Sequence, residues 1–349
     1  MYKLFKNKKI LITGITGFKG SWLLEIFNSL GAKTYGISDN YTTNPNLFSL
    51  VNKNKKNIAT ININDFNKLN NKINLIRPDF IFHLAAQSQV IESIKDPLYT
   101  FKTNILGTAN LLESLKNIKK KCICIIITSD KCYLNENKNK FFKENDRLGG
   151  SDPYSASKAS AELIINSYLK TFYKKNNFVR IGVARAGNVI GGGDWTPNRI
   201  IPDAIKSWSK NKKLLIRNPY SIRPWQHVLE PLNGYISFAK KLYENSKLHG
   251  EAFNFGPSNY KNYTVLDVIQ ELKKSWKDGK FKIVSSKKNI ENNILKLNSN
   301  KSNQLLKWKT KLNFQETIHL TGSWYYTFYN SKTNINKITV DQINEYFKK

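Results

Sequence analysis

The chain has 349 residues, 40% of them hydrophobic, and a formal net charge of +31. This length and apolar content suffice to bury the core of one large or two unequal domains, which excludes an intrinsically disordered protein. No apolar run approaches the roughly 20 residues of a membrane helix, and the apolar stretch after the first lysines is too short for a signal peptide. We therefore expect a cytoplasmic protein without membrane contact.

The positive charge raises the question of nucleic-acid binding. A nucleic-acid surface gathers Lys and Arg on one face or along one helix. The lysines here are spread along the whole chain among many Asn and Ile residues. We expect no nucleic-acid partner, and an anionic small substrate suits the charge equally well.

The N-terminal segment predicts a β-α-β unit, with a β-branched run at Lys9–Thr13, a helix over Gly17–Leu30 and a second strand at Lys33–Ile37. Strands and helices then alternate. Further strands are expected at Asn57–Ile61, Phe80–Ala85, Cys122–Ser129 and Phe178–Ala184, and helices at Phe66–Ile76, Leu98–Lys116 and Pro153–Lys175. This alternation predicts the α/β class with a doubly wound parallel (Rossmann) sheet.

After Ala186 the pattern loosens into Gly- and Pro-rich loops. It resumes with helices near Pro231–Asn245, Val265–Lys277 and Phe314–Asn330, and the polar tail predicts only a short helix, Val340–Phe347. We expect a Rossmann domain over 1–186 and a smaller, mixed α/β substrate domain over 187–349. Since no low-complexity linker separates them, later segments can return strands to the first domain.

A glycine-rich loop, TGITGFKG, joins the first predicted strand to the first predicted helix. Glycines permit the turn and let the backbone approach a pyrophosphate, whose charge then faces the free N–H groups at the helix start. The order strand, loop, helix, strand favours a dinucleotide site over an ordinary tight turn. The cofactor-binding residues expected here are Gly14, Thr16, Gly17, Phe18 and Gly20.

Asp39 lies at the end of the second predicted strand, about 20 residues beyond the glycines. A carboxylate there accepts hydrogen bonds from the adenosine ribose hydroxyls and repels a 2′-phosphate. No Lys or Arg occurs from Thr34 to Asn52, although Lys19 in the loop leaves some ambiguity. NAD is therefore favoured over NADP; the alternative is an Asp-Asn turn that binds no ligand.

Tyr154 and Lys158 are four residues apart in a helix-like segment, so both side chains project from one face. An ammonium so close is expected to lower the pKa of the phenol from about 10. The tyrosine can then take the proton of a substrate hydroxyl while the carbon that carries this hydroxyl gives its hydride to nicotinamide. Taken alone, this spacing is at least as typical of a solvated helix face. The catalytic interpretation rests on the surrounding sequence.

The strand expected before this helix runs into Thr128-Ser129-Asp130-Lys131, at the carboxyl edge where ligands of such sheets bind. Ser129 can orient the tyrosine and a substrate hydroxyl. Asp130 and Lys131 add an acid and a base that hydride transfer alone does not need, which suggests a further proton transfer. On position alone, a charged strand-end turn explains them equally well.

No metal site is expected. Zinc needs four ligands at finger-like spacing, whereas the three cysteines, Cys122, Cys124 and Cys132, have none of the four histidines beside them. We expect buried, reduced thiols, with Cys122 and Cys124 on one face of their strand. His83 is expected in the core, and His227 as a structural histidine with satisfied hydrogen bonds.

The segments TGITGFKG, HLAAQS, TSDKCY, YSASK, ARAGNVIGGGDW and RPWQHVLEP together resemble the CDP-glucose 4,6-dehydratase family of extended short-chain dehydrogenase/reductases, across nearly the whole chain. TGxxGxxG with YxxxK marks only the extended superfamily, whereas TSDKCY, GNVIGGGDW and RPWQHVLEP look like these dehydratases in particular. The related dTDP-glucose dehydratases carry Asp-Glu after the Thr or Ser, and sugar epimerases usually carry small neutral residues there.

The resemblance implies an NAD-dependent dehydration of a nucleotide-activated glucose. Tyr154 would remove the C4 hydroxyl proton as NAD takes the C4 hydride, and Ser129 and Lys158 would complete the set. Lys131 would then abstract the C5 proton while Asp130 protonates the departing C6 hydroxyl, before the hydride returns to C6. Lys131 can act as a base only when neutral, which requires burial or neighbouring cations such as Lys158.

The resemblance also implies binding residues. Ala85 and Ala86 would leave room for the nicotinamide ribose, Ile63 would line the adenine, and Asn62 departs from the Asp usual in relatives. The sugar nucleotide would meet Gln87, Asn188, Arg199 and Arg223, although a structural ion pair explains either arginine equally well. These enzymes usually form homodimers by pairing the helices near 98–116 and 153–175.

Two other functions stay open. An epimerase or a different nucleotide-sugar dehydratase uses the same scaffold, and only the resemblance points to cytidine. Some members of the superfamily serve as redox sensors or RNA-binding proteins with degraded active sites. The intact set of Ser129, Tyr154 and Lys158 argues against this last interpretation.

Overall fold

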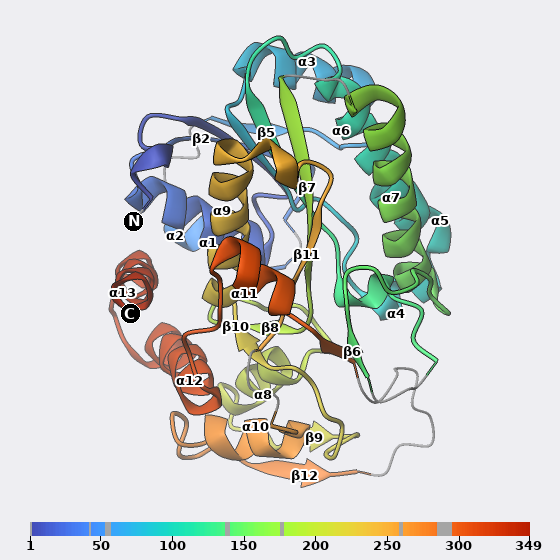
Figure 1. The fold of residues 1–349 in the computed structure, drawn as a ribbon. Helices are drawn as coiled ribbons and strands as arrows, with labels where there is room; N and C mark the ends of the chain where they lie inside the picture. The colour runs from blue at the N-terminus through green and yellow to red at the C-terminus, as the bar shows by residue number, and fades with distance from the viewer. Residues whose placement is uncertain are drawn as a thin grey trace.

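A seven-stranded parallel sheet forms the centre of the computed structural model, which describes residues 2–41, 43–52, 57–136, 140–174, 178–257, 261–284 and 295–349 (Figure 1). Its strands are β1 (Lys9–Thr13), β2 (Lys33–Ser38), β3 (Ile58–Thr60), β4 (Phe80–His83), β5 (Cys122–Ile127), β7 (Val179–Ala186) and β11 (Ala252–Phe255). They lie in the order β11-β7-β5-β4-β1-β2-β3, and every neighbouring pair is parallel. The predicted doubly wound sheet is confirmed.

Two separate cores cover the two faces of the sheet, because successive side chains of a strand point to opposite faces. Ile10 and Ile12 of β1 pack into one core with the helices α1 (Phe18–Ser29) and α9 (Leu229–Glu244). Leu11 packs into the other, formed with α3 (Phe66–Ile76), α6 (Gly107–Leu115) and α7 (Pro153–Tyr168). Burial on both faces explains why the strands are nearly continuous apolar runs.

The ends of the elements decide where the functional residues lie. β4 ends at His83 and β5 at Ile127, earlier than predicted, so Ala85 and Ser129 belong to the loops after these strands. The helix predicted over 98–116 is instead α5 (Pro97–Phe101), a π-helical turn (Lys102–Leu106) and α6. The helix predicted over 153–175 is α7 with a π-helical turn (Leu169–Tyr173), and Lys175 lies outside the described residues.

Several helices have no clear counterpart in the prediction because they are short or start in Gly- and Pro-rich sequence. They are α2 (Leu47–Val51), α4 (Val90–Lys95), α8 (Ile200–Trp208) and α11 (Asn300–Leu306). In contrast, α10 (Val265–Leu272) is shorter than the predicted helix to Lys277, since the chain continues in tighter turns with hydrogen bonds to the third residue back.

The chain after Ala186 lies largely beyond the carboxyl edge of the sheet (Figure 1). It forms two small parallel pairs, β8 (Val189–Ile190) with β10 (Gln226–His227) and β9 (Leu214–Ile216) with β12 (Phe281–Ile283), and its strand β13 (Lys296–Leu297) pairs with β6 (Phe141–Phe142). It also supplies α9 and β11 to the central layers. The division into domains at residue 186 stays a prediction.

The C-terminal tail is more ordered than the sequence predicts. After α12 (Phe314–Asn330), the helix α13 spans Ile335–Lys348, longer than the predicted Val340–Phe347. Thr339 and Tyr346 form part of its buried stripe. Trp324 Nε1 donates a hydrogen bond to Thr339 Oγ1 over 2.9 Å, and the Tyr346 hydroxyl donates to Glu230 Oε2 over 2.7 Å. Packing on α12 and α9 therefore stabilises a helix whose sequence is largely polar.

The three cysteines and two of the four histidines are buried. Cys122, Cys124 and Cys132 are buried free thiols, as predicted. His83 is buried with Nδ1 2.7 Å from Thr13 Oγ1, and burial lowers its pKa to about 3. The prediction for His227 is wrong in part: Nδ1 accepts from Leu229 N–H over 3.4 Å, but the buried Nε2 has no hydrogen-bond partner among the described residues.

No helix in the described part of the chain is both long and apolar enough to cross a bilayer. Within the same residues, no group of three or more His, Cys, Asp or Glu side chains is arranged to hold a metal ion.

Candidate active site

A cavity of about 660 Å³ opens at the carboxyl edge of the central sheet. Its walls come from the loops after β1, β2, β4, β5 and β7, from α7, and from the segment 187–225. All but one of the residues singled out from the sequence line it: Gly14, Thr16, Gly17, Phe18, Gly20, Asp39, Asn62, Ile63, Ala85, Ala86, Ser129, Asp130, Lys131, Tyr154, Lys158, Asn188, Arg199 and Arg223.

Gln87 is the exception. Its side chain turns into the neighbouring helices, where Nε2 donates a hydrogen bond to Thr100 Oγ1 over 2.9 Å. Its backbone N–H donates to Asn104 Oδ1 over 2.8 Å. Ser88 and Gln89, on either side of it, line the cavity instead.

The glycine-rich loop leaves an open cradle at the start of α1. Gly14 has φ +71°, and a Cβ there would lie 2.7 Å from the backbone nitrogen of Ala85. A Cβ on Gly20 would overlap the carbonyl oxygen of Gly14. The N-cap residue Gly17 provides no capping side chain, and the first turn contains no acidic residue. The first N–H groups of α1 are therefore available to an anion, as a pyrophosphate site requires.

Asp39 and Asn62 form the far end of the cavity. Asn62 Nδ2 donates a hydrogen bond to Asp39 Oδ2 over 3.2 Å, and Asn64 N–H donates to Asn62 Oδ1 over 2.9 Å. The second bond fixes the orientation of the Asn62 amide. Asp39 is exposed just after β2, and the bond from Asn62 occupies only one of its two carboxylate oxygens. This position fits a ribose diol, and the negative charge disfavours an added phosphate.

The helix α7 presents Tyr154, Lys158 and Glu162 on successive turns. It begins with Pro153 and is capped by Asp152, whose Oδ1 accepts from Ser155 N–H over 3.0 Å. Tyr154 and Lys158 are buried and line the cavity, so the solvated-face interpretation is wrong for this pair.

The predicted fall in the pKa of Tyr154 is not found. Burial raises the pKa to about 12, and the hydrogen bond with Ser129 and the charge of Arg199 offset only part of that increase. The pKa of Lys158 falls to about 8 because burial disfavours the ammonium, against the opposing charges of Cys132 and Glu162. In the ligand-free protein the cost of burying the phenolate therefore outweighs the nearby cations.

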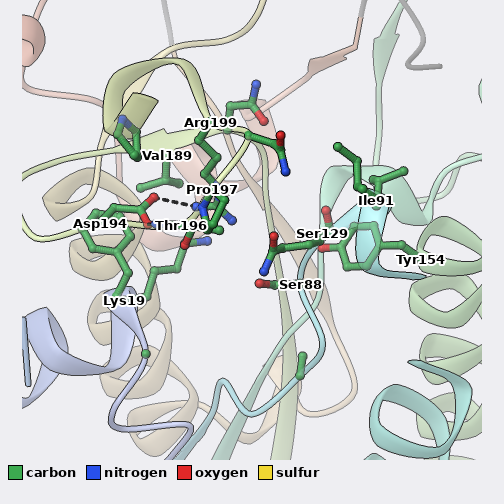
Figure 2. A pocket seen from close by; sticks show the side chains of 18 of the residues that line it. Lys19, Ser88, Ile91, Ser129, Tyr154, Val189, Asp194, Thr196, Pro197 and Arg199 are labelled. Carbon is green, nitrogen blue, oxygen red and sulfur yellow. Dashed lines mark hydrogen bonds and ion pairs between the residues drawn. The ribbon is translucent and has the colours of Figure 1, made fainter. Parts of the chain in front are cut away.

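Ser129 connects the tyrosine to the acidic end of the loop. Its Oγ donates to Asp130 Oδ1 over 2.9 Å and accepts from Lys131 N–H over 3.2 Å, and its side chain lies beside the Tyr154 ring (Figure 2). Asp130 is buried, which raises its pKa. A Cβ on Gly187 would lie 2.7 Å from Asp130 Oδ2, so this glycine makes room for the carboxyl group. Lys131 is only partly buried in the cavity wall.

The opposite wall carries cations. Figure 2 shows Lys19, Asp194 and Arg199 across the cavity from Ser129 and Tyr154. Arg199 Nη1 lies 2.8 Å from Asp194 Oδ2, so Arg199 makes a structural ion pair and also faces the cavity. Burial lowers the pKa of Lys19 to about 8, with the charges of Arg199 and Lys158 adding to the effect and Asp130 opposing it. The sequence identified Lys19 only as an ambiguity in cofactor choice.

The family model described as GDP-mannose 4,6 dehydratase matches residues 11–321. The chain belongs to this family. The cavity of this dehydratase-family member thus combines a dinucleotide cradle with the Ser129, Tyr154 and Lys158 set and two further ionisable groups, Asp130 and Lys131.

Named relatives agree with this assignment. The CDP-glucose 4,6-dehydratase of Salmonella typhimurium (strain LT2) is 40% identical over 327 residues, covering 92% of this chain and 91% of that protein. The dTDP-glucose 4,6-dehydratase of Escherichia coli is 27% identical over 349 residues, covering 91% and 92%.

Solved structures show the same fold. The dTDP-glucose 4,6-dehydratase of Bacillus anthracis in complex with NAD has a TM-score of 0.73 at 25% identity, covering 91% of this chain and 96% of that one. An epimerase of Methanothermobacter thermautotrophicus has a TM-score of 0.79 at 22% identity and covers 94% of each chain, a likeness of fold alone.

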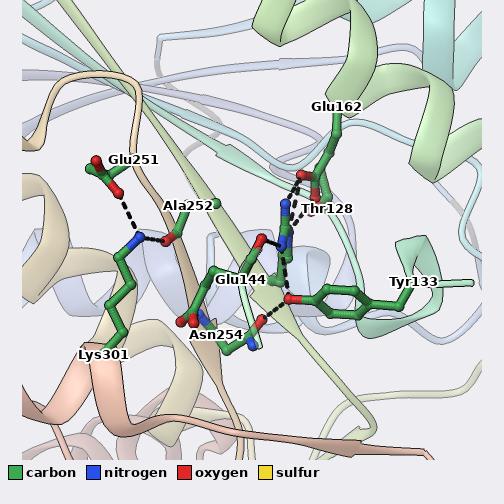
Figure 3. Close-up of polar contacts among 9 residues, drawn as sticks. Thr128, Tyr133, Glu144, Glu162, Glu251, Ala252, Asn254 and Lys301 are labelled. Carbon is green, nitrogen blue, oxygen red and sulfur yellow. Dashed lines mark hydrogen bonds and ion pairs between the residues drawn. The ribbon is translucent and has the colours of Figure 1, made fainter. Parts of the chain in front are cut away.

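This dehydratase-family chain has a buried polar cluster around Glu162, which follows Lys158 by one turn of α7 (Figure 3). Arg185 forms a two-pronged ion pair with Glu162, and Thr128 Oγ1 donates to Glu162 Oε1 over 2.7 Å. Arg185 Nη1 also donates to the Tyr133 hydroxyl over 2.7 Å, which in turn donates to Asn254 Oδ1 over 2.7 Å. The cluster ties α7 to β7, β11 and the loop after β5, and so holds the helix that carries Tyr154 and Lys158.

Proposed function

We propose that this chain is an NAD-dependent CDP-glucose 4,6-dehydratase, a hydro-lyase that converts CDP-D-glucose to CDP-4-dehydro-6-deoxy-D-glucose. The observation that carries the proposal is the placement of Asp130 and Lys131 in the same cavity wall as Ser129, Tyr154 and Lys158. The first two supply the acid and the base that elimination of water needs beyond oxidation. The identity with the Salmonella enzyme supports the choice of CDP-glucose.

The residues of the cavity fit NAD. The cradle of Gly14, Gly17 and Gly20 at the start of α1 suits its pyrophosphate, and Asp39 suits an unphosphorylated adenosine ribose. NAD held there would supply the acceptor for the C4 hydride and the donor of the same hydride to C6. Ala85 and Ala86 and the Lys158 ammonium would hold the nicotinamide end beside Tyr154.

The side chains then carry the protons. Tyr154 as phenolate takes the O4 proton, and Ser129 and Lys158 hold its oxygen in place. The resulting C4 ketone acidifies the C5 hydrogen, which Lys131 removes while Asp130 protonates the departing C6 hydroxyl, since hydroxide is a poor leaving group. Lys131 finally returns the proton to C5. The raised pKa of buried Asp130 suits a general acid near neutral pH.

The cationic wall would bind the substrate diphosphate. It is lined by Arg199, Arg223 and Lys19, and Asn188 lines the same cavity. A guanidinium group can donate two parallel hydrogen bonds to two oxygens of one phosphate. In the proposed reaction this placement gives the basic chain an anionic small-molecule partner.

The decisive experiment incubates the purified protein with NAD and a panel of CDP-, dTDP-, UDP- and GDP-linked sugars. A 4-keto-6-deoxy product from CDP-glucose in preference to the others is the expected result. A C4 epimer with no loss of water would instead identify an epimerase. Salt-sensitive RNA retention without any sugar turnover would identify a binding protein.

Lys131→Ala tests the assignment of the C5 base. The variant should still oxidise C4, because Tyr154 and Lys158 are intact, but wash-in of solvent deuterium at C5 should fall by about 100-fold or more. Mass spectrometry of the recovered sugar nucleotide measures this exchange. Lys170→Ala, an exposed lysine after α7, is the matched control. If deuterium exchange at C5 is unchanged in Lys131→Ala, Lys131 is not the base that removes the C5 proton.

Gly14→Ala tests the cofactor cradle. The added methyl meets the Ala85 backbone, so the loop must move and the rise in Tm on adding NAD should be lost. Gly31→Ala is the matched control, because Gly31 shares a positive φ of +70° but a Cβ there makes only ordinary contacts. Both variants lose about 1–2 kcal/mol to the left-handed backbone, and only Gly14→Ala should lose the NAD-dependent shift. An equal shift in both would place the dinucleotide elsewhere.

We further propose a cytoplasmic homodimer. Leu98 of α5, Leu106 of the π-helical turn and Leu163 of α7 are exposed by 78%, 54% and 60%. Exposed large apolar side chains on adjacent helices are typical of an interface that a second copy buries. The free cysteines suit a reducing compartment. Sedimentation equilibrium measures the mass, and a Leu163→Glu variant should shift it to that of the monomer.

A further inference from the structure

The proposed reaction leaves two protons displaced at the end of each turnover. Lys131 takes a proton from C5 and later gives one of its ammonium protons back to C5, but Tyr154 keeps the O4 proton because the product is a ketone. Asp130 has meanwhile given its proton to the departing hydroxide. The next turnover needs the reverse arrangement, with Tyr154 as phenolate and Asp130 as the acid. A proton must therefore pass from Tyr154 to Asp130 in every cycle.

We propose that Ser129 transfers this proton directly, so that Tyr154 and Asp130 share a single proton through its hydroxyl group. The inference rests on the proposed function. The Tyr154 O–H bond breaks as a bond to Ser129 Oγ forms, and the original Ser129 proton moves to Asp130 Oδ1. No electron pair leaves the three groups and no net charge changes, so the step needs no co-reactant.

The hydrogen bonds of Ser129 suit both ends of the transfer. A hydroxyl has one proton to donate and two lone pairs that accept. In the structure Ser129 donates to Asp130 Oδ1 over 2.9 Å and accepts from Lys131 N–H over 3.2 Å. Its second lone pair is left for the neighbouring Tyr154 hydroxyl when Tyr154 holds the proton. When Asp130 holds it, Ser129 accepts from Asp130 and Lys131 N–H and donates to the phenolate. The full capacity of the hydroxyl is used in each arrangement.

Burial favours direct proton transfer through Ser129 over exchange of the proton with water. Ser129, Asp130 and Tyr154 are exposed by 7%, 6% and 8% before any ligand occupies the cavity. Figure 2 shows Ser129 beside the Tyr154 ring at the cavity wall. Gly187 lies against the second carboxyl oxygen of Asp130. A substrate in the cavity would cover the remaining access, so exchange with water would be slow while sugar is bound.

The surrounding charges set where the proton rests. Near Asp130, burial favours the acid, whereas Lys131 and Lys19 favour the carboxylate. Near Tyr154, burial favours the neutral phenol. The remaining charged groups that affect Tyr154 are Asp130 and Asp152, which oppose the phenolate, and Arg199, which favours it.

Burial thus raises both pKa values, that of Tyr154 to about 12. The positive charge that oxidised nicotinamide would bring to the same cavity would favour the phenolate and therefore the proton on Asp130. One transfer then creates the base and the acid together.

The test compares the first turnover with later ones. Wild type and Ser129→Thr, which keeps a hydroxyl, should form 4-keto product at a constant rate. Ser129→Ala is first equilibrated with NAD in buffer, so that the proton has time to reach Asp130 from solution. It should then give a burst of about one product per site. Its steady-state rate should then be at least about tenfold lower than the burst rate. Rapid quench measures the burst, and the NAD-dependent Tm shift verifies that each variant is folded.

Varying the buffer concentration shows which step limits the steady-state rate of Ser129→Ala. Small acid–base pairs such as imidazole and acetate should raise the steady-state rate of Ser129→Ala in proportion to their concentration and leave wild type unchanged. If Ser129→Ala slows the burst and the steady state equally, Ser129 only orients Tyr154 and the proposed transfer is wrong. If the steady-state rate of Ser129→Ala does not change with buffer concentration, product release limits that rate and the proposed transfer is also wrong. A wild type that forms no 4-keto product overturns the proposed function, and the proton transfer with it.

Discussion

Tyr154→Phe is expected to lower kcat for formation of the 4-keto product by about 10²–10⁴-fold, because it removes the phenol that we propose takes the O4 proton in the cavity that Lys158 also lines. The phenyl ring keeps the packing of the buried tyrosine, so the fold and the cofactor cradle should be unchanged. The assay follows product by mass spectrometry, and titration of the Tm shift with NAD measures cofactor binding separately.

The control for this variant is Tyr220→Phe, which removes a hydroxyl from a side chain that is 74% exposed. Its kcat should equal that of wild type. If Tyr154→Phe keeps full turnover, the phenol is not the base and the proposed chemistry is wrong at its first step. If it loses activity and also the NAD-dependent shift, the tyrosine serves mainly in binding.

Arg185→Met should lower the free energy of unfolding by about 3–5 kcal/mol, because it leaves the Glu162 carboxylate buried without its cation. Urea unfolding followed by far-UV circular dichroism measures the change. Activity should fall as well, since the cluster holds α7 against β7 and Glu162 faces Lys158.

Two further variants separate charge from packing in this cluster. Lys301→Met removes the cation of the more exposed ion pair with Glu251 and should cost at most about 1 kcal/mol. Adding Glu162→Gln to Arg185→Met removes the stranded charge and should recover part of the lost stability. Equal losses for Arg185→Met and Lys301→Met would mean that Glu162 finds another partner or water.

The sequence predicts best what depends on short spacing. The glycine-rich loop at the end of a strand and the Tyr154–Lys158 pair on one helix face follow from local periodicity, and both are found where expected. The parallel sheet follows from the alternation of apolar runs. Because the carboxyl ends of all parallel strands meet at one edge, these elements bring most of the predicted site residues into one cavity.

What the sequence misses depends on neighbours that are distant along the chain. Gln87 follows β4 as expected, but its side chain donates to Thr100 of α5, and its backbone is held by Asn104 of a π-helical turn that a sequence pattern does not reveal. The pKa of Tyr154 rises because the folded chain buries the phenol, an effect larger than that of the lysine one turn away. Lys19 lies near Asp130 only after α1 and β5 are brought together.

The position of β11 limits how such enzymes can be recombined. This strand and α9 come from the second half of the chain, yet one extends the central sheet beside β7 and the other covers a face of it. A chimaera joined at residue 186 would therefore replace part of the cofactor scaffold along with the sugar pocket. Exchange of substrate preference between relatives is physically simplest through the segment 187–225, which lines much of the cavity, while α9 and β11 stay in place.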